Sequence, residues 1–251
     1  MTDLRQSTAT ADVVAPEPAS EQVATQSPET AFFAGLVDHV ANAMSSAHSP
    51  DALAKRLLDI VGALLLGVVF SPLMLLIVLL THREGGSVIY EHRRVGRGGR
   101  MFGCLKFRTM VSNADQVLRD LLDKDPELKA EWVRDHKLRN DPRITRLGRF
   151  LRRTSLDELP QIWNVLKGDM SLVGPRPVVR EELLRYGRNV RAYLAAQPGI
   201  TGLWQVTGRN DTDYRRRVAL DTYYVRKRNI RLDLYILLKT TRVVLGGNGA
   251  Y

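Results

Sequence analysis

Cysteine is nearly absent from this sequence, since Cys104 is the one thiol among 251 residues. A single cysteine cannot form an intramolecular disulfide, and it excludes a zinc site made of several thiolates. The five histidines are scattered, without the HxxxH or HxxEH spacing of histidine-based metal sites. A metal bound here would be held by carboxylates and phosphate groups, which favours Mg²⁺ or Mn²⁺.

Internal repeats and the signatures of nucleic-acid-binding folds are also missing. No RNP, helix-turn-helix or zinc-finger pattern accompanies the net charge of +10. The glycine-rich stretch RVGRGGR is not a dinucleotide fingerprint, because no clear strand precedes it and no helix follows it. These absences count against nucleic acid as a partner and against a dinucleotide-binding fold.

Basic residues are scarce in the first 50 positions, which hold Arg5 against six acidic residues: Asp3, Asp12, Glu17, Glu21, Glu29 and Asp38. Residues 1–30 have no apolar periodicity and are predicted to be disordered, whereas residues 31–46 could form a short amphipathic helix. The rest of the chain keeps 36 of the 37 basic and 21 of the 27 acidic residues, a net charge of +15. Such a basic body favours anionic lipid headgroups or phosphate-bearing substrates.

One long uncharged segment, Ile60–Leu80, stands out against this charge. As a straight helix it would extend roughly 31 Å, which is enough to cross a bilayer core. Ser71-Pro72 lies at its centre, and proline removes a helical hydrogen bond and disfavours helical geometry at the preceding residue. A break in the middle of the segment is therefore predicted.

Both flanks of this segment are basic, with Lys55 and Arg56 before it and Arg83 after it. Because positive charge marks the cytoplasmic side, we expect residues 51–83 to form a re-entrant helix-break-helix hairpin. Two alternatives stay open, a single spanning helix with a kink and the buried helix of a soluble core. A signal peptide is disfavoured, since the segment starts near residue 60, lacks a cleavage site and is too long for an h-region.

The remaining residues, 84–251, are predicted to form a globular domain of the α+β class, mainly α. Ser87–Tyr90 and Met101–Phe107 predict two short strands, joined by a turn at Gly96–Gly99 into a small β-hairpin. Leu203–Val206 predicts a further strand.

Surface helices complete this expected domain. Residues 112–139 predict one or two charged helices, and Tyr214–Leu245 predicts one or two amphipathic helices lying on a surface, at the membrane interface.

The densest motif runs from Arg152 to Pro177 and reads RRTSLDELPQIWNVLKGDMSLVGPRP. Its SLDE segment matches a capping box with Ser155 at the N-cap, which would place Asp157 and Glu158 in the first turn of a helix. The N–H groups of that turn suit a phosphate, and Arg152 supplies a cation. Such parts are what phosphoryl transfer requires, but a capping box is also ordinary helix architecture.

Two further positions combine a cation with a restrained backbone. Pro175 and Pro177 fix φ on both sides of Arg176, so this arginine is presented with little backbone freedom. Lys106 lies near the end of the second predicted strand, and Arg209 lies in a turn. The alternative explanations are a stiff turn with an exposed side chain for Arg176, a solvated hairpin for Lys106 and a plain surface turn for Arg209.

Taken together, these segments resemble the bacterial sugar transferase family, the monotopic polyprenyl-phosphate phosphoglycosyl transferases. The matching pieces, in family order, are KRLLDIVGALLLGVVFSPLMLLIVLL, KFRTM, DPRITRLGRFLRRTSLDELPQIWNVLKGDMSLVGPRP, PGITGLWQVTGRN and DLYILLKT. The resemblance covers about residues 53–245. It implies transfer of a hexose-1-phosphate, galactose or glucose, from a UDP-sugar to undecaprenyl phosphate with release of UMP, the first step of exopolysaccharide repeat-unit assembly.

The resemblance also implies roles for particular residues. Asp157 would be the nucleophile that forms a covalent phosphosugar adduct, and Glu158 would hold Mg²⁺. Ser71 and Pro72 match the break of the family's membrane hairpin. The residues implied in substrate binding are Lys106, Arg152, Pro175, Arg176, Pro177, Arg209 and Asp233.

The expected location is the inner membrane of a bacterium, with a monotopic anchor and the catalytic domain on the cytoplasmic face. Membrane lipids and the two substrates are the expected partners; a second copy of the chain and downstream glycosyltransferases are left open. Many larger relatives have extra spanning helices ahead of the shared core. This sequence has only a short tail there and so resembles the compact exopolysaccharide-type members. The charged stretch near 115–139 is an addition to the smallest members and has no assigned role.

Two other functions stay open on sequence grounds. A non-enzymatic membrane scaffold could use the hairpin and the basic face to recruit partners, and it would tolerate loss of Asp157. Nucleic-acid binding through the basic body is the second, and the missing motifs count against it.

Overall fold

A computed structural model describes residues 50–135, 138, 140–208 and 213–245 of the chain. The acidic tail and its predicted short helix, the turn at Arg209 and the last six residues lie outside the described residues.

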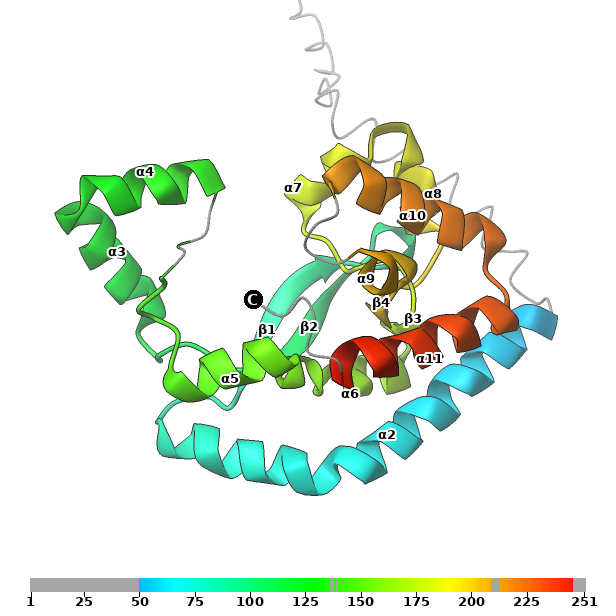
Figure 1. Cartoon of the computed structure of the whole chain (residues 1–251), viewed down its shortest axis with the longest axis horizontal. Coiled ribbons are helices and arrows are strands. Elements are labelled where there is room, and N and C mark those ends of the chain that lie inside the picture. Colours follow the sequence, from blue (N-terminus) through cyan, green and yellow to red (C-terminus); the bar gives the residue numbers. More distant parts are fainter. Residues whose placement is uncertain (1–49, 136–137, 139, 209–212, 246–251) are drawn as a thin grey trace, which may run out of the picture.

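Helix α2 (Pro50–Arg83) is a single helix of 34 residues with Pro72 inside it. Pro72 has no N–H for the carbonyl of Val68, four residues earlier, and the hydroxyl of Ser71 donates to that carbonyl instead, at 2.8 Å. The helix is bent, and both of its ends rise toward the globular body (Figure 1). The structure therefore has one bent helix where the sequence predicted two helices and a break, because the serine compensates for the hydrogen bond that the proline removes.

Most apolar side chains of α2 are exposed. Leu57, Leu65 and Val68 are 61%, 63% and 72% exposed, and only 11% of the most apolar part of the helix is buried. Its length and composition are sufficient to cross a membrane. A core helix of a soluble protein would be covered, so this surface is typical of a helix in contact with lipid.

A buried polar junction fixes the N-terminal half of α2 to the body. Asp59 is fully buried and accepts hydrogen bonds from the Ser171 hydroxyl and the backbone N–H of Leu172, each at 3.0 Å. The ammonium of Lys55 lies 3.2 Å from Asp59 and 3.0 Å from Asp233. Three elements that are far apart in the sequence, around residues 59, 171 and 233, thus meet at one set of charges.

The predicted β-hairpin is confirmed. Strands β1 (Ile89–Val95) and β2 (Met101–Phe107) are antiparallel, with Val95 opposite Met101. The turn holds Gly98 and Gly99 at φ of +67° and +79°, a region that favours glycine. The first strand continues to Val95 instead of ending at Tyr90.

A second sheet pairs β3 (Ser171–Val173) with β4 (Gly199–Thr201) in parallel. The predicted strand at Leu203–Val206 is wrong, because these residues belong to helix α9 (Leu203–Thr207). Leu203 and Val206 are three residues apart and both buried, as one face of a helix requires.

Helices surround the two sheets, and the fold is mainly helical α+β, as predicted. The core joins β2, α6, β3 and α9 with residues of α10 and α11. The charged helices predicted near 112–139 are α3 and α4, which project from the body, and those predicted at 214–245 are α10 and α11 (Figure 1). The bounds are α3 (Ala114–Lys124), α4 (Pro126–Asp135), α5 (Arg146–Thr154), α6 (Gln161–Lys167), α7 (Arg180–Leu183), α8 (Val190–Leu194), α10 (Tyr214–Lys227) and α11 (Ile230–Leu245), with 3₁₀ segments η1 (Arg97–Gly99), η2 (Leu156–Glu158) and η3 (Leu184–Asn189).

The polar junction predicts a specific loss of stability. Asp59→Ala removes the acceptor of the Leu172 N–H and leaves the Lys55 ammonium with one partner fewer, which costs about 3 kcal/mol. Thermal unfolding in detergent should show a clearly lower Tm than wild type. Asp51→Ala, at an exposed position of the same helix, is the matched control. Equal Tm values for the two variants would contradict the role assigned to the junction.

Candidate active site

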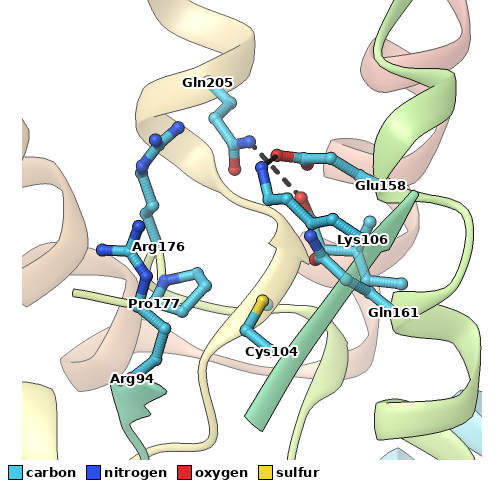
Figure 2. A pocket seen from close by; sticks show the side chains of 10 residues that line it. Arg94, Cys104, Lys106, Glu158, Gln161, Arg176, Pro177 and Gln205 are labelled. Atoms are coloured by element: carbon cyan, nitrogen blue, oxygen red, sulfur yellow. Dashed lines mark hydrogen bonds and ion pairs between the residues drawn. The ribbon is translucent and has the colours of Figure 1, made fainter. Parts of the chain in front are cut away.

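A pocket beside the β-hairpin collects side chains from both sheets and from the segments around them (Figure 2). Its lining includes three cations, one carboxylate and two amides. The lining residues are Arg94, Cys104, Lys106, Glu158, Gln161, Arg176, Pro177, Gly199, Ile200 and Gln205.

The two acidic residues lie on η2, a single 3₁₀ turn between α5 and α6. Ser155, just before it, has φ of 59° and ψ of 16°, and its side chain makes no capping hydrogen bond. The predicted capping hydrogen bond is therefore absent, and Ser155 also ends α5. Ser155 does lie at the N-cap of η2, with Asp157 and Glu158 in its first turn, but that turn is 3₁₀ and not the start of an α-helix. Pro160 lacks the N–H that a helix begun at Leu156 would need, so regular helix begins only at Gln161. A left-handed serine costs of order 1 kcal/mol, and such residues cluster at functional sites.

Lys106 lies between the two carboxylates. Its Nζ is 2.6 Å from Glu158 Oε1 and 3.6 Å from Asp157 Oδ2. Burial raises the pKa of Asp157, an effect that Lys106 opposes but does not cancel. Burial acts on Glu158 in the same way, but Lys106 and Arg176 outweigh it, so the pKa of Glu158 is lowered. The same surroundings thus shift the pKa values of the two carboxylates in opposite directions, which favours a more basic Asp157 and an ionised Glu158.

Strand β2 is held in place by a buried amide. Asn164 of α6 accepts from the backbone N–H of Leu105 at 3.0 Å and donates to the carbonyl of Gly103 at 2.7 Å. Asn164 is fully buried, so these bonds are shielded from water. They set the position of Lys106, the next residue along the strand.

Arg152 approaches the carboxylates from α5. Its Nε donates to the hydroxyl of Thr109 at 2.8 Å, and its charge lowers the pKa of Asp157. Arg152 does not line the pocket itself.

The Pro-Arg-Pro segment follows β3 and packs closely on β4. The Gly174 N–H donates to the carbonyl of Thr201 at 2.9 Å, and the Gly199 N–H donates to that of Pro175 at 2.8 Å. A Cβ on Gly174 would collide with the backbone around Gln197, so only glycine fits there. Arg176 follows this closely packed backbone, and its side chain lines the pocket.

The structure brings together Lys106, Glu158, Arg176 and Pro177 in the pocket wall, with Asp157 beside Lys106. Asp233 lies elsewhere, in the polar junction, where it contacts Lys55 and accepts from the Tyr224 hydroxyl at 2.7 Å. The other predicted residues are distributed as follows: Pro175 is buried behind the pocket wall, Ser71 and Pro72 lie in the bend of α2, and Arg209 is outside the described residues.

Four polar lining residues are not predicted by the sequence patterns: Arg94, Cys104, Gln161 and Gln205. The hairpin register contains the signal for Arg94. His92 lies opposite Cys104 and Tyr90 opposite Lys106, so Arg94, two residues further on, shares their face of the hairpin. The amides offer no comparable sequence signal.

The fit of a divalent metal can be tested on the donor set. Among the described residues no three His, Cys, Asp or Glu side chains gather into a group that could hold a metal unaided. Mg²⁺, however, is usually bound through one or two carboxylates together with substrate phosphates. Glu158 supplies a carboxylate, and Gln205 Oε1 is a buried acceptor without a hydrogen-bond partner within the described structure. The residues present therefore fit a Mg²⁺–diphosphate complex better than a free ion.

Comparison with known proteins agrees with this geometry. The chain is 56% identical over 197 residues to "Undecaprenyl-phosphate galactose phosphotransferase" of Salmonella typhimurium, covering 78% of this chain and 41% of that protein. It is 54% identical over 197 residues to "UDP-galactose-lipid carrier transferase" of Erwinia amylovora, covering 78% and 41%. The chain thus spans about two fifths of the length of the first curated relatives that it matches.

A relative of similar size matches nearly end to end. "Exopolysaccharide production protein ExoY" of Sinorhizobium fredii is 44% identical over 229 residues, which cover 91% of this chain and 99% of that protein. The model of the family described as "Bacterial sugar transferase" matches residues 50–247, which include α2 and every lining residue of the pocket. The chain therefore belongs to the bacterial sugar transferase family.

Proposed function

We propose that this protein transfers a hexose-1-phosphate, galactose or glucose, from a UDP-sugar to undecaprenyl phosphate and releases UMP, priming exopolysaccharide assembly. The observation that carries the proposal is the contact of Lys106 with both Asp157 and Glu158 in a pocket lined by two arginines. This is the charge pattern that a diphosphate and a carboxylate nucleophile need in order to approach one another. The names of the relatives, two of which specify galactose, support the substrate class.

In the first half-reaction, a carboxylate oxygen of Asp157 attacks the β-phosphorus of the UDP-sugar. A new P–O bond forms to the aspartate, and the bond from that phosphorus to the bridging oxygen breaks, so UMP leaves with the bonding electrons. Lys106 and Arg152 offset the repulsion between the anionic nucleophile and the anionic phosphate. The raised pKa of Asp157 favours the attack because it makes the carboxylate more basic.

Mg²⁺ belongs to this proposal. Glu158 would hold it, with its carboxylate kept ionised by Lys106 and Arg176, and the ion would neutralise part of the diphosphate charge. Lys106 would then share the Glu158 carboxylate with the ion.

In the second half-reaction, a phosphate oxygen of undecaprenyl phosphate attacks the phosphorus of the adduct. The bond to Asp157 breaks, the carboxylate is regenerated, and the sugar becomes linked to the lipid through a diphosphate. The pocket must keep water from the acyl-phosphate-like adduct until the lipid arrives. Burial of Asp157, which is 7% exposed, serves that purpose.

The bent helix α2 supports a re-entrant path through one leaflet. Its two ends turn toward the body and its exposed surface is apolar, which fits a helix that enters the bilayer and returns. Ser71 and Pro72 would lie at the deepest point. The body would then rest on the cytoplasmic face of the inner membrane, where a lipid phosphate and a soluble nucleotide sugar can both reach the pocket.

Replacing the nucleophile gives the central test. Asp157→Asn should abolish both UMP release and a radiolabelled covalent adduct from a UDP-galactose or UDP-glucose donor, because the amide cannot form the acyl phosphate. EDTA should prevent adduct formation by the wild-type enzyme. Asp123→Asn, at an exposed position of α3, is the control. A fully active Asp157→Asn enzyme would exclude the mechanism and favour a scaffold role.

The contact between Lys106 and Asp157 predicts how the rate of adduct formation depends on pH. The pKa of Asp157 is raised by burial and held down by Lys106, so Lys106→Met should move it further up. The acid limb of the rate of adduct formation should therefore shift to higher pH, with a loss of about a hundredfold in rate at neutral pH. Lys167→Met, at an exposed lysine paired with Asp169, should leave the profile in place. An unshifted acid limb in Lys106→Met would refute the assigned coupling.

The topology has its own test. Accessibility tags placed at residues 45 and 251 should both be labelled only after the cells are permeabilised, since both would be cytoplasmic. Labelling of one tag on intact spheroplasts would show that α2 is a single spanning helix.

A further inference from the structure

We propose that Arg94 joins Arg176 in a clamp for the nucleotide-side phosphate of the donor, the phosphate that leaves as UMP. Arg176 belongs to the Pro-Arg-Pro segment that the family resemblance already implies in substrate binding, and Arg94 is the new member. The identity of this ligand rests on the proposed function. The position of the clamp rests on the pocket wall that faces Lys106 and Glu158, where Figure 2 shows both arginine side chains.

The two arginines come from segments that are joined directly. Arg94 precedes Val95 at the end of β1, and Arg176 lies two residues before Val178. The Val95 N–H donates to the carbonyl of Val178 at 2.9 Å, and the two residues form an isolated β-bridge. Both guanidinium groups are therefore carried by one stretch of hydrogen-bonded backbone.

Arg94 is held in place by two weak polar contacts. One of its terminal nitrogens lies 3.3 Å from His92 Nδ1, and the other lies 3.8 Å from a carboxylate oxygen of Glu182, too far for a strong hydrogen bond. The side chain is only 15% exposed. A guanidinium has five N–H donors, so several of them stay available to a ligand in the pocket.

The two like charges also repel one another. Burial lowers the pKa of Arg94, the neighbouring Arg176 lowers it further, and the Glu182 carboxylate offsets these effects only in part. Bringing two cations together in a partly enclosed pocket is unfavourable unless an anion lies between them. Each guanidinium can bind two phosphate oxygens at once, so one phosphate would relieve this repulsion.

The order of the phosphates follows from the position of the nucleophile. The attacked phosphorus must lie beside Asp157, next to Lys106, so the second phosphate of the donor lies one bridging oxygen further into the pocket. The opposite wall, with Arg94 and Arg176, is where that group would be bound. When the bridging bond breaks, negative charge grows on the departing phosphate, and fixed cations stabilise that charge.

UMP is the probe for the test, which uses the full-length enzyme in detergent. For Arg94→Ala we expect inhibition by UMP to weaken about tenfold to a hundredfold, with a comparable rise in the KM for the UDP-sugar. The KM for the polyprenyl phosphate should stay within about twofold of wild type, because the attacking lipid does not use this wall. A general loss of structure would not separate the two substrates in this way.

Arg93→Ala is the matched control, because Arg93 is exposed on the other face of the same strand. It should leave inhibition by UMP unchanged. Arg94→Lys keeps a cation near Glu182 and extends the test if the alanine variant fails to fold. We expect it still to bind UMP several-fold more weakly than wild type, since an ammonium lacks the paired donors of a guanidinium.

The outcomes separate the two proposals. A wild-type enzyme that forms no adduct and releases no UMP would overturn the proposed function. An active wild type whose inhibition by UMP is unchanged in Arg94→Ala, or in Arg94→Lys where only that variant folds, would overturn the clamp alone.

Discussion

One ammonium lies between two neighbouring carboxylates and favours the ionised form of each. Lys106 contacts Asp157 and Glu158, and the structure around it keeps it there. Asn164 ties β2 to α6, and the left-handed turn at Ser155 brings the acidic pair to the strand. The inequality of the two carboxylates follows from the same contact, since the lysine is a full angstrom closer to Glu158 than to Asp157.

The attachment of α2 and the phosphate-binding wall share one strand. Asp59 binds the backbone at Leu172 and the side chain at Ser171, both in β3, and β3 leads directly into the rigid segment that carries Arg176. The opposite end of that segment is bridged to β1 through Val95 and Val178. The apolar helix and the cationic wall are thus parts of one hydrogen-bonded framework, which explains why a charged junction, costly to bury, is retained at the start of α2.

Local patterns in the sequence predict the parts of the fold that depend on local physics. The glycines at 96–99 predict the hairpin, and the apolar run predicts α2, because turn chemistry and periodicity act over a few residues. The parallel pairing of Ser171–Val173 with Gly199–Thr201 has no such signal, since it joins two three-residue strands across 25 intervening residues. The same limit explains the error at Leu203–Val206, where a four-residue apolar pattern fits either period.

The residues of the site likewise divide into those that local motifs predict and those that only the folded structure shows. Asp157, Glu158, Lys106 and Arg176 lie in motifs that the sequence displays, and the structure gathers them around one pocket. Asp59 emerges only from tertiary contacts, because a lone acid in a helix looks ordinary. Arg94 is one arginine among several, and only the pairing register of the hairpin places it on the face of Lys106. At Ser155 the SLDE segment satisfies the capping pattern, but Pro160 delays the regular α-helix to Gln161.

The hydroxyl of Ser71 stabilises the bend of α2, because it donates to the Val68 carbonyl in place of the N–H that Pro72 lacks. The shape of the bend is therefore set by the protein and not by the lipid. A straight spanning helix must tilt or thin its surroundings when bilayer thickness varies. A bent helix that enters one leaflet and returns does not have to match its length to the thickness of the bilayer. In the re-entrant arrangement proposed above, the height of the pocket over the lipid phosphates would depend on the chain itself and would be the same in thick and thin membranes.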